Sequence, residues 1–260
     1  SQQRGGADVA FDEKGRRTGG ARLLAVVTLK PGEQGRHYRL PTERDYEAVW
    51  KAQQRLAAII REWERGGRKG LCPVPDEPLP PERTLGFRVQ KYGMRTWGDL
   101  FTARQKLALA TLARAVRELP AAVPEAVRLA MAAAMSRCAD HWSSAAMWIQ
   151  DLEAVAHTFG RQALPIVWDF VEACGYGEGG ASLTGQIDWV ARVVDTWPGS
   201  PAGQVQPADA TEHPLPDDAA TIWFTDPPYY DAVPYADLSD FFFVWLKRTL
   251  PGHPLLRDPF

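Results

Sequence analysis

The chain has 260 residues, of which 45% are hydrophobic and 24% are charged, and its formal net charge at pH 7 is −2. Such a length holds one large or two small domains, and this hydrophobic content is sufficient for a packed core. No apolar run approaches the roughly 18–20 residues of a membrane span, and the Gly-rich beginning lacks the apolar core of a signal peptide. Three scattered cysteines, Cys72, Cys138 and Cys174, argue against a disulfide framework. We therefore expect a cytoplasmic protein without a membrane partner.

The charges are distributed unevenly along the chain. Residues 1–100 contain 19 Lys and Arg against 13 Asp and Glu, whereas residues 101–260 contain 11 against 19. Basic side chains in the first part could neutralise DNA phosphates, although solvated surface charge is the more common role of such residues. The candidates are Lys14, Arg16, Arg17, Arg22, Arg61, Arg65, Arg68 and Lys69. No helix-turn-helix or zinc-finger spacing accompanies them, so the sequence does not locate a base-reading element.

The beginning of the chain predicts a hairpin followed by a helix. Residues 22–29 favour a strand, and a Pro-Gly turn separates them from a return strand at 37–40. Thr42 and Asp45 match a capping box, and apolar residues then recur at helical spacing. Gly66-Gly67 ends this pattern.

A Pro-rich segment follows the predicted helix. Residues 71–82 contain five prolines, at positions 73, 75, 78, 80 and 81. Proline removes a backbone donor and favours extended chain, so we interpret this segment as an extended linker between the first part and the second.

The middle of the chain predicts a mainly helical region. Thr102 and Gln105 form a capping box at the start of a helix that ends near Pro120. Further helices are predicted at 124–139, 143–157, 165–174 and 185–196. Trp142, Trp148 and Trp168 are assigned to the core, because aromatic residues at helical spacing pack more often than they stack on bases.

Two motifs of this region match functional patterns only in part. Gly175-x-Gly177-x-x-Gly180 matches the dinucleotide fingerprint formally, but a predicted helix precedes it where that fingerprint needs a strand. The second motif has residue types that bind metals, yet the spacing of its second half is not the tight pair of a metal site, so no metal site is predicted. A core cysteine and partly exposed histidines are the favoured interpretation. This second group comprises Cys138, His141, His157 and Cys174.

The strongest chemical signal lies near the end of the chain. Asp226-Pro227-Pro228-Tyr229 directly follows the apolar run at 222–224, which favours a strand. Two prolines leave stiff backbone with free carbonyl acceptors. Asp226 and the carbonyl of Pro227 could then accept the two protons of an exocyclic amine. Tyr229 could stack on an extruded base, which contributes about 1–3 kcal/mol against the few kcal/mol that base flipping costs.

This tetrapeptide resembles the catalytic motif of amino-methyltransferases that act on DNA. The flanks, at residues 92–101, 157–165 and 230–246, resemble one family in particular, the large adenine-specific DNA methylases with a DUF1156 region. The leading Asp favours adenine, and cytosine remains the alternative. The resemblance implies S-adenosylmethionine as cofactor, DNA as partner, and other subunits of a restriction or phage-defence system as further partners.

The same resemblance assigns roles to residues around the motif. Tyr230, Asp231 and Tyr235 would line the base pocket, and Asp209 would contact the cofactor, although an ordinary turn carboxylate is an equal interpretation of Asp209. The family's Phe-x-Gly-x-Gly methyl-donor loop has no match here. We therefore expect an internal fragment that is inactive alone, and two alternatives stay open: a non-enzymatic DNA-binding or scaffold module, and methylation of RNA.

The fold class implied is α/β, a partial Rossmann-like methyltransferase half preceded by a large mainly helical region and a small N-terminal hairpin-plus-helix segment. The predicted domains are a basic hairpin-plus-helix segment (1–70), a Pro-rich linker and lead-in (71–96), a helical region (97–200) and the catalytic-motif half (201–260). Asp226 would then lie at the carboxyl end of a parallel strand, where ligands bind in such sheets.

Overall fold

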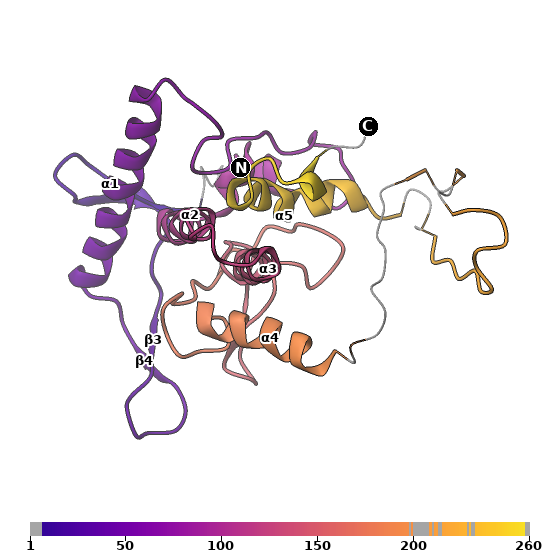
Figure 1. Cartoon of the computed structure of the whole chain (residues 1–260). Coiled ribbons are helices and arrows are strands. Elements are labelled where there is room, and N and C mark those ends of the chain that lie inside the picture. The colour runs from indigo at the N-terminus through magenta and orange to yellow at the C-terminus, as the bar shows by residue number, and fades with distance from the viewer. Residues whose placement is uncertain are drawn as a thin grey trace.

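The structure is a computed structural model, and it describes residues 7–197, 199, 208–209, 211–212, 215–227, 229 and 232–257 (Figure 1). Within these residues the chain combines five α-helices with small antiparallel sheets. The helices are α1 (Glu43–Arg65), α2 (Ala103–Arg117), α3 (Glu125–His141), α4 (Leu183–Thr196) and α5 (Tyr235–Thr249), and short 3-10 turns lie at Val89–Tyr92, Trp97–Leu100 and Pro254–Leu256. The mixed α/β content agrees with the expected class.

The strands of the described residues form three separate two-stranded antiparallel sheets. They pair β1 (Val9–Phe11) with β2 (Arg17–Gly20), β3 (Val26–Thr28) with β4 (His37–Arg39), and β5 (Trp148–Ile149) with β6 (Ala154–Val155). The β3–β4 hairpin confirms the pairing predicted for the first part of the chain. The β1–β2 hairpin was not predicted, because two of its four β2 residues are glycines, which carry no strand signal.

The two predicted capping boxes are both present. Thr42 and Asp45 begin α1, and the backbone N–H of Gly66 donates to the carbonyl of Glu62 where the helix ends. At the start of α2, the N–H of Thr102 donates to Gln105 Oε1 at 2.9 Å, and the N–H of Gln105 donates to Thr102 Oγ1 at 3.3 Å. Each reciprocal pair satisfies amide donors that the first turn of a helix leaves without a partner.

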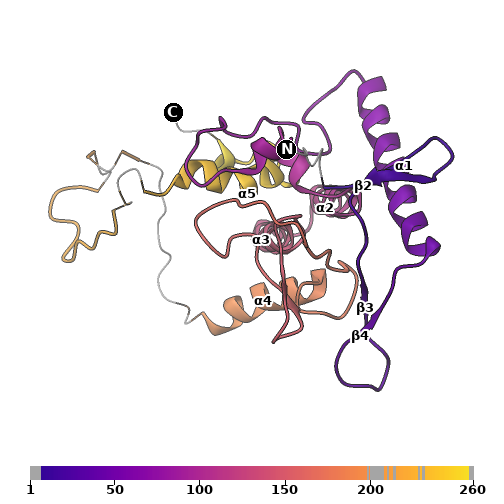
Figure 2. The same ribbon diagram turned by 180° about the vertical axis from the view of Figure 1, so that it is seen from behind.

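The core is built by α2, α3 and α5, which meet at the centre of the molecule. α5 packs against α2 and α3, α4 packs against α3, and α1 packs against the outer side of α2 (Figures 1 and 2). Aromatic rings fill the contact of α5 with the segment before α2, where Phe101 stacks on Phe241 with ring centroids 5.5 Å apart and meets Trp245 edge-on. The most buried core members include Leu100, Leu109, Met135, Cys138, Leu164 and Trp245.

The prediction of a helix is wrong for two segments. Residues 143–157 contain the short β5–β6 hairpin and no helix. Ser143 Oγ accepts a hydrogen bond from the N–H of Ala145, which competes with a first helical turn. Residues 165–174 contain no helix, and the N–H of Val171 donates to the carbonyl of Ala146 rather than along a helix. Tertiary backbone hydrogen bonds therefore override the helical spacing of both segments.

The core assignment of the three tryptophans holds only in part. Trp142 is buried, and its Nε1–H donates to the carbonyl of Ala181 at 2.7 Å. Trp148 is half-buried in β5. Trp168 is 59% exposed and touches Tyr92 edge-on, so its assignment to the core was wrong.

The last part of the chain also differs from expectation. Residues 222–224 form no strand, and the side chains of Ile222 and Phe224 are 81% and 92% exposed. The aromatic face of α5 is buried as expected, but it packs against helices and not against a sheet. A strand needs a neighbouring strand for its backbone donors and acceptors, and none of the sheets formed by the described residues includes this segment.

The Pro-rich segment is extended, but it is held in place. Cys72, Val74 and Leu79 are buried, and Cys72 and Val74 join Leu56 of α1 in a small apolar cluster. This segment therefore contributes to packing, while the domain boundaries at 70, 96 and 200 stay predictions.

Candidate functional site

The motif residues that the structure describes lie on the surface. Asp226 and Pro227 are exposed, and the side chain of Tyr229 is 68% exposed. The other predicted members, Pro228, Tyr230 and Asp231, lie outside the described residues. The carboxylate and the ring of the described members are thus open to a ligand from solvent.

The motif lies a few residues before α5, which begins at Tyr235. The N–H of Ala232 donates to the carbonyl of Tyr229, and that of Leu238 donates to the carbonyl of Pro234 as the helix begins. Tyr235, predicted to line the base pocket, occupies the first helical position and is 48% exposed. In Figure 1 the described stretch between α4 and α5, drawn in orange to yellow, extends away from the helices. It leaves them at the N-terminal end of α5. The buried aromatic face of α5 therefore fixes one end of the motif segment.

Asp209, predicted to contact the cofactor, is engaged in a local turn. Its Oδ1 accepts hydrogen bonds from the N–H and from the Oγ1–H of Thr211, at 2.8 Å and 2.7 Å. These hydrogen bonds lower the pKa of the exposed Asp209 carboxyl. This geometry is that of a turn carboxylate, the second interpretation of the sequence.

The predicted site residues are not joined to one another. Among the residues that the structure describes, no hydrogen bond or ion pair links Asp209, Asp226, Tyr229 and Tyr235. Asp209 and Asp226 are both exposed, whereas a cofactor site encloses most of its ligand. These residues alone do not fit S-adenosylmethionine.

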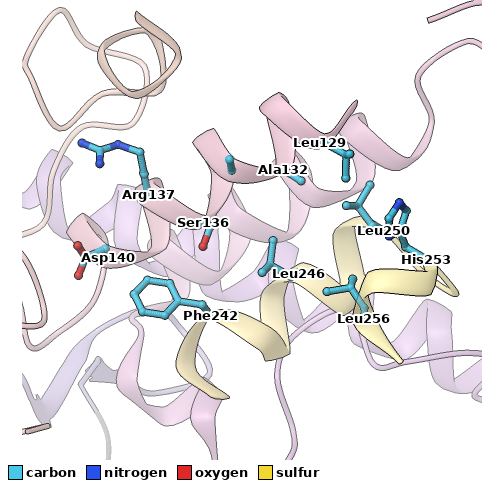
Figure 3. A pocket seen from close by; sticks show the side chains of 11 residues that line it. Leu129, Ala132, Ser136, Arg137, Asp140, Phe242, Leu246, Leu250, His253 and Leu256 are labelled. Carbon is cyan, nitrogen blue, oxygen red and sulfur yellow. The ribbon is translucent and has the colours of Figure 1, made fainter. Parts of the chain in front are cut away.

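A groove that the sequence did not predict lies where α5 crosses α3. It has a volume of about 490 Å³ and a mainly apolar lining (Figure 3). Figure 3 shows Phe242 and Leu246 of α5 beneath Ser136 of α3, with Asp140 near Phe242 and His253 at the opposite end. The full lining is Leu129, Ala132, Ala133, Ser136, Arg137, Asp140, Phe242, Leu246, Leu250, His253 and Leu256. The small residues Ala132, Ala133 and Ser136 of α3 leave the space between the two helices.

The charged and imidazole groups of this groove, those of Arg137, Asp140 and His253, are already paired within the protein. Arg137 Nε donates to Gln186 Oε1 of α4 at 2.9 Å, and Asp140 Oδ2 lies 2.6 Å from His157 Nδ1. At the other end His253 Nε2 lies 2.8 Å from Glu125 Oε1. The groove contains no residue of the motif, so it does not contribute to the chemistry expected at the motif.

The cysteine and histidine residues considered as metal ligands form no metal-binding group. Burial raises the pKa of the Cys138 thiol to about 12, which opposes the thiolate that a metal requires. The rings of His141 and His157 are 4.3 Å apart, and burial lowers the pKa of His141. His141 is buried, contrary to the expected partial exposure, whereas His157 is exposed. Across the described part of the chain, no cluster of three or more such side chains could hold a metal ion.

Two general findings complete the picture of the site. None of the described helices is long and apolar enough to cross a membrane. Comparison of the chain with protein-family models, with curated proteins and with solved structures finds no match.

Proposed function

We propose that this chain supplies the base-binding catalytic motif of a DNA methyltransferase that modifies the exocyclic amine of adenine. The observation that carries the proposal is the sequence Asp226-Pro227-Pro228-Tyr229, whose described members Asp226, Pro227 and Tyr229 are exposed and non-helical and lie shortly before a firmly packed helix. The accessibility of Asp226 and of the Tyr229 ring supports it, because both must meet a nucleotide that has left the duplex.

The chemistry assigned to these residues is positioning. The Asp226 carboxylate accepts one amine proton and the Pro227 carbonyl accepts the other, which leaves the nitrogen lone pair directed outward. Tyr229 stacks on the base, and Tyr230, Asp231 and Tyr235 complete the pocket. Asp226 need not be a strong base, since an amine loses a proton readily once it is methylated, so its hydrogen bond orients the nucleophile.

S-adenosylmethionine would supply the methyl group. Since Asp209 and Asp226 do not enclose a ligand, the proposal assigns cofactor binding to residues beyond those described. The separation of the motif from the residues that bind the cofactor also favours a second candidate, a DNA-binding or scaffold module without activity. Calorimetric titration with S-adenosylmethionine separates the two: heat that saturates supports the enzyme, and silence from a folded full-length protein supports the module.

The decisive experiment measures transfer of a radiolabelled methyl group from S-adenosylmethionine to DNA by the natural full-length polypeptide. Asp226→Ala should lower the rate by at least about 100-fold, the usual cost of one transition-state hydrogen bond, without changing the unfolding temperature. Asp217→Ala is the matched control, since it removes another exposed carboxylate of the same stretch. Label in adenine that disappears only in Asp226→Ala supports the proposal.

Three results would contradict the proposal or its details. Equal rates for the parent and Asp226→Ala would refute the role of the motif. Label in cytosine would move the target to the other base, and a preference for RNA over DNA in competition would change the substrate class.

A further inference from the structure

A second cleft, of about 750 Å³, is lined by the β1–β2 hairpin and by the N-terminal half of α1. Basic and aromatic side chains dominate its lining. The residues are Phe11, Lys14, Gly15, Arg16, Arg17, Glu43, Arg44, Tyr46, Glu47 and Trp50. None of them belongs to the motif or to the α3–α5 groove.

The basic residues of the hairpin are held in a defined geometry. Asp12 Oδ1 accepts hydrogen bonds from the N–H groups of Lys14 and Arg16, both at 2.9 Å. Gly15 completes the turn with a φ of 75°, a left-handed conformation that a side chain would strain. The turn therefore fixes the backbone that carries Lys14, and Arg17 follows it as the first residue of β2.

Aromatic residues of α1 fasten this turn to the helix. The backbone of Gly15 covers Trp50 so closely that a Cβ there would lie 3.1 Å from the indole ring. Arg17 lies over the ring of Tyr46 at 4.7 Å and donates to its hydroxyl at 2.6 Å. One face of each ring is thus occupied within the protein, so these rings are poor platforms for stacking a free base.

The cleft retains positive charge after its internal ion pairs are counted. Arg16 pairs with Asp12, and Glu47 pairs with Lys51 of the same helix. Lys14, Arg17 and Arg44 form no ion pair with a carboxylate in the part of the chain that the structure describes, and all three are exposed. Glu43 is the remaining acidic side chain of the lining.

We infer that this cleft binds the phosphate backbone of double-stranded DNA. Lys14 of the turn, Arg17 of β2 and Arg44 of α1 place three exposed cations around one cleft, where they can neutralise DNA phosphates. The covered rings argue against binding of single strands by base stacking. Figures 1 and 2 place α1 on the opposite side of α2, α3 and α5 from the described motif segment. The cleft therefore contacts DNA away from the target base, and its binding does not depend on methyl transfer.

The test measures the salt dependence of binding by the full chain to a fluorescein-labelled DNA duplex of about 20 base pairs. Each phosphate contact adds a factor of about 3.5 to the loss of affinity that follows when salt is raised from 50 to 200 mM. The combined variant Lys14→Ala, Arg17→Ala and Arg44→Ala should reduce this salt-induced loss about 40-fold. Because Arg17 also holds Tyr46, the double variant Lys14→Ala with Arg44→Ala is measured too, and should reduce it about 12-fold.

The matched control removes three other exposed cations, Lys91, Arg95 and Arg161, with the same change in net charge. It should leave the salt dependence close to that of the parent. An unchanged slope in the triple variant, or an equal decrease in the control, would overturn the inference. Tighter binding of an RNA duplex or of single-stranded DNA of the same sequence would overturn the assignment of the ligand. Absence of methyl transfer leaves these outcomes unaffected.

Discussion

Arg248 of α5 donates a hydrogen bond from Nε to the carbonyl oxygen of Cys72 at 2.7 Å. The same guanidinium reaches the carbonyl of Val74 at 3.0 Å and the carboxylate of Glu77 at 2.8 Å, with its side chain only 3% exposed. Burial alone would raise the pKa of Glu77, but hydrogen bonds from Arg248 and Lys247 outweigh it and lower that pKa. One buried side chain thus holds the Pro-rich segment against the last helix of the core.

Arg248→Lys should destabilise the protein by about 2–4 kcal/mol, because an ammonium cannot reproduce the planar fork and leaves buried carbonyls without a donor. Urea unfolding at neutral pH measures the change. Arg114→Lys is the matched control, since the ion pair of Arg114 with Glu118 is exposed and 3.9 Å long. It should change stability by less than about 0.5 kcal/mol. Equal effects of the two variants would contradict the role given to Arg248.

Stability should decrease in acid through His141. Burial, assisted by the neighbouring His157, lowers the pKa of His141, with Asp140 acting in the opposite direction and Arg137 in the same direction. The unfolded chain then binds this proton more tightly, so the contribution is complete above about pH 6.5 and is lost as the pH falls below it. The urea concentration at the unfolding midpoint should decrease as the pH is lowered from about 7.5 to 5.5. His141→Phe should make this dependence on pH less steep. Parallel slopes for parent and variant would rule out this residue as the cause.

Phe224→Ser distinguishes the structure from the strand that the sequence predicts. With the Phe224 side chain 92% exposed, the substitution should change the free energy of unfolding by no more than about 0.5 kcal/mol. In a buried strand the same change would remove several kcal/mol. Chemical denaturation of the two proteins decides between these values, and Phe241→Ser in the core serves as the destabilised reference.

Thr102→Ala should cost about 1 kcal/mol, because it removes the hydroxyl that accepts from the N–H of Gln105 at the start of α2. Thr111→Ala is a suitable comparison, since Thr111 lies within α2 and its hydroxyl bonds only the carbonyl of Leu107. The difference between the two unfolding midpoints measures the cap. A difference near zero would show that the cap does not contribute to stability.

Local signals in the sequence predicted local structure well. The capping residues Thr42 and Thr102 placed the starts of α1 and α2, and the turn at Pro31-Gly32 placed the β3–β4 hairpin. Each of these signals acts within a few residues, since a cap or a turn satisfies its own backbone. The aromatic face of α5 was also recognised, because its helical spacing is strong.

Structure that depends on distant partners was not predictable in the same way. The hydrogen bond from Val171 to Ala146 replaces a helix that apolar spacing favours, and nothing within either segment encodes the other. The same limit applies to the cleft beside β1 and β2, whose lining joins residues 11–17 to residues 43–50. Of the candidate site, the motif could be read from its residues, whereas the isolation of Asp209 from Asp226 could not.

The anchoring of residues 72–77 by Arg248 also bears on the order in which the chain assembles. On the ribosome, the Pro-rich segment emerges long before α5, so its buried carbonyls have no guanidinium to accept from until translation is nearly 180 residues further on. Contacts between such distant residues slow folding and leave early segments waiting in a partly formed state. Of the helices that build the core, α5 is synthesised after α2 and α3, so the contact that holds the Pro-rich segment forms late.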